Sequence, residues 1–391
     1  MKLKILYLTQ HAEIGGGETI LLSLLEKLDR NRFSPHVVVP KQGTLTKELE
    51  SRKVPASVLS LPGYLIRTLF IPGMSPFGIF RFMKLVKKIK PDLIHLNHLN
   101  LAVYAGIAGR LLKIPIVATA HGPWDTLYFY QDALTNFCVN LLLPNTKYLA
   151  KKLLRRNIIP SHKIRFLPFG IDTEKFKPRP KEAAKKRLGM KHSDVVITNV
   201  GRFDPKNNHL SFLRAANLIN RQLPKTKILI VGSSLGNFSD RINTNSPERK
   251  IKGYLKNHAK LRRNVILTGF VNDMERIYAA TDILISTSLL ETFGLALAEA
   301  QASGIPVVAT NAGSQSLIVK DGQTGFLVPP GQPKAAADKI LILAKDPKLR
   351  QQFGKYSREH VLARFTITRY VNTIESMYRQ MIRRKNQDFR K

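Results

Sequence analysis

The sequence predicts an α/β protein built from two Rossmann-like domains, each a doubly wound parallel sheet covered by helices. The chain of 391 residues is long enough for two domains. Short apolar strands alternate with helical patterns from end to end, as in parallel α/β layers. A Pro- and Lys-rich run over residues 175–187 interrupts the pattern, which then restarts. The hydrophobic share of 43% and charged share of 23% exclude a disordered or fibrous chain.

The elements follow in order from hydrophobic periodicity. In the first half, residues 2–8 form a short buried-type strand and residues 19–28 carry apolar side chains at helical spacing. Further strands are predicted at residues 36–39, 93–96 and 116–118. The second half repeats the pattern with a strand at 195–200, a helix over 209–221, and strands at 227–231, 265–267, 283–286 and 306–309. Residues 233–248 are predicted as a long polar loop, and residues 367–384 as a helix.

Charge is the unusual property of this chain. Lys and Arg total 63 against 27 Asp and Glu, a formal net charge of +36 that is spread over both halves. Such a field attracts polyanions: nucleic acid, anionic lipid headgroups or phosphorylated substrates. The single cysteine, Cys138, excludes an intramolecular disulfide and a thiolate metal cluster. No stretch has the ~18 apolar residues of a spanning helix and the first residues lack a secretory signal, so we expect a cytoplasmic protein.

A nicotinamide-dependent dehydrogenase is the first function to test against this fold, and the sequence disfavours it. Such an enzyme has a G-x-G-x-x-G loop after its first strand and an acidic residue ~20 positions later for the ribose. Here the loop reads Gly15-Gly16-Gly17-Glu18, and the second strand ends at Val39 without a carboxylate.

The strongest chemical signal is the pair Glu291 and Glu299, between two predicted strands. Eight positions span at most roughly 12 Å along a helix, whereas the two carboxylates of a glycosidase lie ~5–9.5 Å apart. The longer span suits a ligand with a sugar at one end, a ribose at the other and a diphosphate between them. Backbone N–H groups of Phe293, Gly294 and Leu295 are candidates to receive the phosphates. By spacing alone, an amphipathic helix with one solvated glutamate fits as well.

Several further motifs lie in order along the chain. They are Gly15 to Glu18 (GG-x-E), Pro91 to His95 (PD-x-I-H), Thr119 to Gly122 (H-G), Gly170 to Asp172 (G-V-D), Gly201 to Phe203 (G-R), Glu291 to Glu299 (E-x7-E) and Asp321 to Gly325 (D-G-x-x-G). Together they resemble glycosyltransferase family 4 (glycosyl transferases group 1), a retaining group with the GT-B fold, over nearly the whole chain. The resemblance implies an acceptor-binding domain over residues 1–170, a nucleotide-sugar-binding domain over 171–365, and a C-terminal helix over 366–391 that crosses back to the first domain.

The resemblance also implies roles for single residues. Glu299 would bind the ribose, Glu291 the donor sugar, and Arg202 the diphosphate leaving group. The loop with Gly16 and Gly17 would close over the phosphates from the other side. The implied catalytic residues are His121, Glu291 and Arg202, and the implied donor-binding residues are Gly16, Gly17, Arg202, Lys206, Asn207, Glu291, Phe293, Gly294, Leu295 and Glu299. His121 would lie beside the sugar.

Neither a metal nor a cofactor is expected, and the nucleotide sugar is a substrate. No D-x-D-like cluster stands at a strand end. The charge that develops on the leaving diphosphate would be stabilised by Arg202 and by helix N–H groups.

The chain departs from the family pattern at a few positions. The family usually places a lysine five residues after the arginine, where this chain has Asn207, with Lys206 one residue earlier. A long, flexible lysine stem can absorb that offset. Thr292 replaces the usual glycine after the first glutamate, and residues 313–317 lack the carboxylate of the family's G-G-x-x-E.

Two other groups of residues allow more than one interpretation. His95 and His98 flank a strand end, where interior or cleft histidines are favoured over a metal pair because no third ligand is spaced for one. Trp124, Tyr128, Phe129 and Tyr130 follow His121, and either line an acceptor site or pack half-buried.

Residues 61–90 suggest contact with an anionic membrane. An unusually apolar segment over residues 61–72 precedes a helix with apolar side chains on one side and Arg81, Lys84 and Lys88 on another. A basic amphipathic helix beside exposed aromatic residues fits the membrane interface, whereas the alternative is that its apolar face simply packs on the sheet.

The sequence leaves three functions to compare. The favoured one is a retaining, metal-independent transferase that moves a sugar from a UDP- or GDP-sugar to an envelope glycan or lipid-linked acceptor, peripheral on the inner face of the cytoplasmic membrane. The second is an inactivated GT-B scaffold that binds polyanions or nucleic acid, although no nucleic-acid motif is present and no such partner is expected. The third is a soluble transferase of storage sugars.

Overall fold

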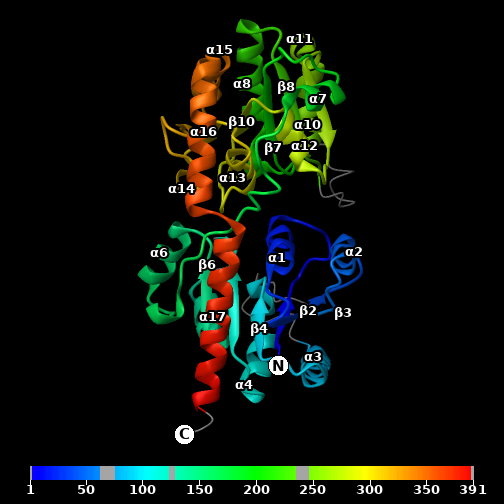
Figure 1. Ribbon diagram of the computed structural model, residues 1–391, viewed down its shortest axis with the longest axis vertical. Coiled ribbons are helices and arrows are strands. Elements are labelled where there is room, and N and C mark those ends of the chain that lie inside the picture. Colours follow the sequence, from blue (N-terminus) through cyan, green and yellow to red (C-terminus); the bar gives the residue numbers. More distant parts are fainter. Residues whose placement is uncertain (1, 62–74, 123–127, 235–245, 389–391) are drawn as a thin grey trace. The chain divides into compact units, whose positions relative to one another are not determined.

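The computed structural model describes residues 2–61, 75–122, 128–234 and 246–388, and these form two compact units (Figure 1). Unit 1 comprises residues 1–170 together with 367–391, and unit 2 comprises residues 171–366. The last helix of the chain is therefore part of unit 1.

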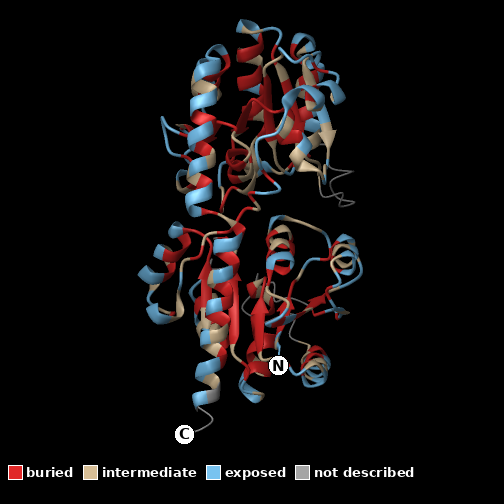
Figure 2. Cartoon of the chain, viewed as in Figure 1, coloured by how far each residue is buried: buried red, intermediate tan, exposed pale blue. Residues whose placement is uncertain are grey.

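Unit 1 contains a parallel six-stranded sheet in the order β3-β2-β1-β4-β5-β6. Its strands are β1 (Leu3–Leu8), β2 (Phe33–Val39), β3 (Ala56–Val58), β4 (Leu93–Leu96), β5 (Ile116–Ala120) and β6 (Leu141–Pro144). The central strands are apolar along most of their length because helices cover both faces of a parallel sheet. Figure 2 shows these strands as buried, while the helices have one buried and one exposed side.

The helices of unit 1 form two layers. They are α1 (Gly16–Lys27), α2 (Thr44–Ser51), α3 (Pro76–Ile89), α4 (Ala102–Leu111), α5 (Phe129–Cys138), α6 (Lys147–Arg156) and α17 (Ile367–Asp388). The central helix α4 contacts both α3 and α5, while α17 packs against α1.

A buried polar chain fastens α17 to the sheet of unit 1. The hydroxyl of Tyr378 on α17 bonds to Nδ1 of His95 on β4 and lies 3.2 Å from the hydroxyl of Tyr7 on β1. His95 Nε2 lies 2.9 Å from Oγ1 of Thr119 on β5. Burial lowers the pKa of His95 to about 3, so its ring is neutral. His95 is therefore a satisfied interior histidine, as one of the two interpretations proposed.

Unit 2 contains a second parallel six-stranded sheet, in the order β12-β11-β10-β7-β8-β9. Its strands are β7 (Val196–Val200), β8 (Lys227–Val231), β9 (Val265–Gly269), β10 (Ile283–Ser286), β11 (Val307–Thr310) and β12 (Gly325–Val328). Its helices are α7 (Lys181–Arg187), α8 (His209–Gln222), α10 (Pro247–Lys256), α11 (Ala259–Arg262), α12 (Met274–Ala280), α13 (Leu295–Ala302), α14 (Gln315–Ile318), α15 (Pro333–Lys345) and α16 (Pro347–Arg364).

A buried ion cluster ties α7 to the sheet of unit 2. Asp282, which precedes β10, accepts hydrogen bonds from Lys181 Nζ at 2.6 Å and from Lys185 Nζ at 2.7 Å. It also accepts the Val196 N–H of β7 at 2.9 Å. Burial favours the neutral acid, but the two lysines outweigh it and hold the pKa of Asp282 below its usual value. The carboxylate is thus ionised, and both of its oxygens accept hydrogen bonds.

The predicted strands are confirmed with shifts of a few residues at their ends, and the helices predicted at 19–28, 209–221 and 367–384 are α1, α8 and α17. Three strands were not predicted. They are β3, which has only three residues, β6, which ends in a proline, and β12, which follows directly on a turn. The polar loop predicted to residue 248 ends earlier, because Ser246 caps α10, whose first residue is Pro247. Residues 235–245 of that loop lie outside the described part of the chain.

We expect Asp282→Asn to destabilise unit 2 strongly. The substitution leaves Lys185, which is almost completely buried, without its counter-charge, and such a loss costs about 3–5 kcal/mol of unfolding free energy. Hydrogen exchange of peptides from β7 and β10 in the full chain measures the effect. Because the pKa of Asp282 is lowered on folding, the wild-type contribution should be present at neutral pH and be lost on acidification.

The matched control is Lys181→Met, which removes the more exposed of the two lysines. Its side chain is 44% exposed, and we expect a loss of at most about 1 kcal/mol. Equal effects of the two substitutions would show that the buried Lys185–Asp282 pair contributes no more to stability than the more exposed Lys181–Asp282 pair.

Candidate active site

The candidate residues of unit 2 gather at the carboxyl edge of its sheet. Arg202, Lys206 and Asn207 follow β7, and Glu291 follows the neighbouring strand β10. The carboxyl ends of parallel strands share one edge, which is where ligands bind in open α/β sheets. The loops meet directly, because the Leu289 N–H donates to the Lys206 carbonyl oxygen at 2.7 Å.

The backbone at Arg202 is held by two side chains. Its carbonyl oxygen accepts hydrogen bonds from Asn207 Nδ2 at 2.7 Å and from His209 Nε2 at 2.9 Å. The Arg202 guanidinium is half exposed, with Nη2 3.4 Å from Asp204 Oδ2. The Asn207 amide thus braces the loop that carries Arg202. Contact between Asn207 and a donor stays a prediction.

The backbone of Glu291 is fixed by the loop that follows β11. Its carbonyl oxygen accepts the Ser314 N–H at 3.0 Å, and Gly313 pairs with it as an isolated bridge. Gly313 has a φ of +70°, and a Cβ there would lie 2.2 Å from the Glu291 oxygen. Only glycine allows this approach, so the segment that lacks the family carboxylate still positions Glu291.

The Glu291 carboxylate lies in a mixed environment. Burial raises its pKa, while the nearby Lys206 ammonium and the Thr292 N–H, which donates to Oε1 at 3.2 Å, act in the opposite direction. Lys206 therefore places its charge near the Glu291 carboxylate.

Helix α13 presents its N-terminus at the same edge. Gly294 is its N-cap with a φ of +89°, and the first helical hydrogen bond runs from Ala298 N to the Gly294 oxygen at 3.0 Å. The N–H groups of the first turn, including that of Leu295, have no partner within the helix. The Phe293 ring is buried, 5.9 Å from the ring of Phe365, so only its backbone can face a ligand.

Glu299 lies one turn further along α13 and is half-buried. The Tyr278 hydroxyl donates to its Oε2 at 2.8 Å. Burial raises the pKa of Glu299 to about 7, although the Tyr278 hydrogen bond and the Lys175 ammonium favour the carboxylate.

In unit 1, a buried carboxylate organises the Gly15–Glu18 loop. Glu18 Oε2 accepts the Gly15 N–H at 3.2 Å, which closes the first turn of α1, and Oε1 accepts the Thr9 hydroxyl at 3.0 Å. Gly16 and Gly17 are the first residues of α1. A Cβ at Gly17 would lie 3.2 Å from His121 Cε1, so this loop and His121 pack closely.

His121 is a neutral histidine. Its Nε2 lies 2.6 Å from the Asn97 carbonyl oxygen, to which it must donate. Burial lowers the pKa of His121 to about 4. The ring of His98 lies 5.2 Å away, and His11 packs edge-on against His98 at 4.7 Å. The described residues contain no group of three or more His, Cys, Asp or Glu side chains placed to hold a metal ion.

Sequence reasoning missed the partners that hold these residues: Glu18 as a loop brace, the packing of His11 and His98 near His121, and Tyr278. Adjacent strand ends were the available signal for His98 and His121, because β4 and β5 are neighbours. Of the aromatic residues after His121, Tyr128 and Phe129 are 50% and 71% exposed and do not enter the core. Trp124 lies outside the described residues.

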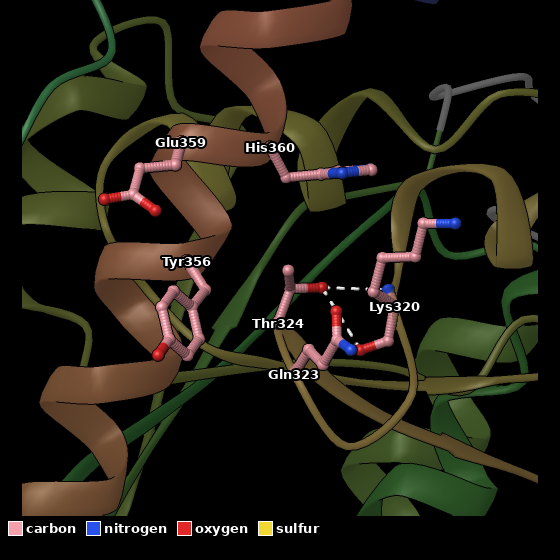
Figure 3. A pocket seen from close by; sticks show the side chains of 6 residues that line it. All are labelled: Lys320, Gln323, Thr324, Tyr356, Glu359 and His360. Carbon is pink, nitrogen blue, oxygen red and sulfur yellow. Dashed lines mark hydrogen bonds between the residues drawn. The ribbon is translucent and has the colours of Figure 1, made fainter.

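A hollow of about 440 Å³ in unit 2 is separate from these residues (Figure 3). It is lined by Lys320, Gln323, Thr324, Tyr356, Glu359 and His360. Thr324, which accepts the Lys320 N–H at 2.9 Å, precedes the first residue of β12. The hollow therefore borders the amino end of β12, the opposite edge of the sheet from Glu291, and contains no predicted site residue.

Two relatives align over most of the chain. A D-inositol 3-phosphate glycosyltransferase of Kribbella flavida is 32% identical over 376 residues, which cover 84% of this chain and 85% of that protein. The UDP-Gal:alpha-D-GlcNAc-diphosphoundecaprenol alpha-1,3-galactosyltransferase of Escherichia coli is 26% identical over 403 residues, which cover 97% of this chain and 98% of that protein.

Solved structures share the fold. The crystal structure of Anabaena Alr3699/HepE in complex with UDP superposes with a TM-score of 0.82 at 22% identity, covering 97% of this chain and 100% of that one. The predicted GT-B fold class, with two Rossmann-like units, is confirmed. Two family models match successive parts of the sequence, "Glycosyltransferase Family 4" over residues 14–175 and "Glycosyl transferases group 1" over residues 180–360. The chain therefore belongs to the group 1 glycosyl transferases, the glycosyltransferases of family 4.

Proposed function

We propose that this protein is a retaining, metal-independent glycosyltransferase that moves a sugar from a UDP- or GDP-sugar to a hydroxyl of an envelope glycan or a lipid-linked acceptor. The observation that carries the proposal is the arrangement around α13, where Glu291 and Glu299 lie on either side of a helix N-terminus. Lys206 lies beside Glu291. A relative named as a galactosyltransferase of a diphosphoundecaprenol-linked sugar supports the lipid-linked acceptor class.

Unit 2 would bind the donor through separate groups that match its ribose, its diphosphate and its sugar. Glu299 accepts hydrogen bonds from the ribose hydroxyls, and Glu291 accepts them from the sugar. The diphosphate lies against the N–H groups at the start of α13. Arg202 and Lys206 are positively charged, and they stabilise the leaving diphosphate more strongly as it becomes more negative in the transition state.

Unit 1 would bind the acceptor, and some of its residues would also contact the sugar that is transferred. The loop of Gly16 and Gly17, braced by Glu18, presents backbone N–H groups at the start of α1. His121 is neutral at pH 7, because burial lowers its pKa to about 4. We infer that it contacts the transferred sugar as a polar group and not as a cation.

A peripheral location on the inner face of the cytoplasmic membrane fits the surface of α3. Phe77 and Phe80 are 67% and 66% exposed, and Arg81, Lys84 and Lys87 continue the exposed face of the same helix. The opposite face packs in the core through Phe82 and Val86. One helix thus has a buried apolar face and an exposed aromatic and basic face. No helix of the described residues is long and apolar enough to cross a bilayer.

The function itself is tested by ligand screening. We expect UDP or GDP to raise the melting temperature, because a ligand that binds only the folded state stabilises it by RT ln(1 + [L]/Kd). The matching sugar nucleotide should be consumed when a lipid-linked acceptor is supplied, in the presence of EDTA, with the anomeric configuration of the donor kept in the product by NMR. Absence of binding to either nucleotide at millimolar concentration refutes the proposal and leaves the inactivated scaffold.

Lys206→Met should lower the turnover number by 10²–10³-fold, because loss of one group that stabilises developing negative charge costs about 2.7–4 kcal/mol. Steady-state kinetics with saturating donor measures this effect. Lys225→Met, a change of the same type in the same unit before β8, is the control and should leave turnover unchanged. A variant at Lys206 that keeps wild-type turnover would remove this lysine from the diphosphate site.

The membrane proposal predicts flotation with vesicles that contain phosphatidylglycerol and not with phosphatidylcholine alone. Arg81→Gln combined with Lys84→Gln should weaken the partition roughly 30-fold, since each basic residue near an anionic surface contributes about 1 kcal/mol. The control is Lys250→Gln with Lys256→Gln on α10, which removes equal charge from exposed helix positions of unit 2. If both pairs weaken flotation equally, the attraction comes from net charge and not from α3.

A further inference from the structure

Tyr278 is a fully buried tyrosine whose hydroxyl meets the candidate nucleotide site. It belongs to α12, is 2% exposed, and its ring packs edge-on against that of Phe176 at 5.7 Å. Its hydroxyl lies 2.8 Å from Glu299 Oε2 and 3.4 Å from the Ala296 carbonyl oxygen. The shorter distance identifies the carboxylate as the acceptor of its single hydrogen.

Among the groups around Glu299, the hydrogen bond from Tyr278 contributes most to stabilising the ionised carboxylate. Lys175 is the nearby cation, but its ammonium also lies 3.6 Å from Glu275 Oε2, and Glu275 disfavours a second negative charge. On α16, which packs against α13, the Arg358 guanidinium donates to the carbonyl oxygens of Ala302 and Phe176. Arg358 is thus committed to backbone groups, and Tyr278 is the neutral donor in contact with the carboxylate.

We propose that Tyr278 is a positioning residue for the nucleotide, holding the Glu299 carboxylate in the orientation and the ionised form that accept the ribose hydroxyls. The inference rests on the proposed function and extends it to a residue that does not itself touch the ligand. A carboxylate accepts several hydrogen bonds, so the bond from Tyr278 leaves acceptor positions for the ribose. A protonated carboxyl group would instead offer a donor and lose acceptor capacity.

The Tyr278 hydroxyl can donate its hydrogen bond to Glu299 at every physiological pH. Burial raises the pKa of its hydroxyl well above the usual value, and the adjacent Glu299 acts in the same direction, so the hydroxyl keeps its hydrogen. Glu299, with a pKa near 7, is the group that titrates. Nucleotide affinity should therefore fall as the pH is lowered through about 7. Removal of the hydroxyl should move that fall to higher pH, because a hydrogen bond to the charged form of Glu299 is lost.

The test is calorimetric titration of the full-length protein with UDP and with GDP at pH 6, 7 and 9. At pH 7, Tyr278→Phe should weaken binding of the nucleotide that the wild type prefers roughly tenfold, as expected for one hydrogen bond to a charged group. The loss should shrink at pH 9, where Glu299 is ionised in both proteins. In a Glu299→Gln background the same substitution should have little further effect, because the group that it positions is already altered.

Two controls separate this role from general destabilisation. Tyr254→Phe removes a hydroxyl from α10 of the same unit and should leave affinity unchanged. Melting temperatures of all variants report folding. Wild-type affinity in Tyr278→Phe, a loss that is equal at all three pH values, or an undiminished loss in the Glu299→Gln background would each overturn the inference. If the wild type binds neither nucleotide, the proposed function fails and the inference fails with it.

Discussion

Burial of two carboxylates beside one helix N-terminus is the constraint on which the site in unit 2 depends. Low polarity favours the neutral acids at Glu291 and Glu299, so each needs a nearby group that favours the ionised form. Around Glu291 this is Lys206 and the adjacent backbone, and around Glu299 it is Tyr278 and Lys175. In the neighbouring loops, Gly313 allows the close backbone approach to Glu291, and the Asn207 amide holds the backbone at Arg202.

Unit 1 differs in that two of its buried titratable side chains are neutral histidines. His95 and His121 are buried and uncharged, and each ring is fixed by hydrogen bonds to neutral partners. The buried side chain of Glu18 accepts hydrogen bonds from the Gly15 N–H and the Thr9 hydroxyl. The basic residues that give the protein its large net charge lie instead on exposed surfaces such as that of α3. Buried neutral histidines near the candidate site and exposed basic residues on helices such as α3 therefore occur together.

The strand pattern and the ordered motifs were sufficient to predict the fold class, because buried parallel strands are continuous apolar runs that stand out in a sequence. The same motifs led to Glu291, Glu299 and Arg202. What could not be predicted is how the supporting residues act, since this depends on contacts between distant segments. An asparagine such as Asn207 can bind a ligand or a carbonyl oxygen, and only the fold shows its bond to Arg202. Nothing near Tyr278 in the sequence links it to a residue 21 positions later.

The membership of α17 in unit 1 has a consequence for biosynthesis. Residues 1–170 leave the ribosome first, but the tyrosine that completes their buried polar chain is residue 378. Unit 2 is continuous in sequence and has all its strands and helices before that residue is made. Domains generally fold in the order of synthesis, yet here residues 1–170 lack the Tyr378 contacts of His95 and Tyr7 until after the whole of unit 2 has been made.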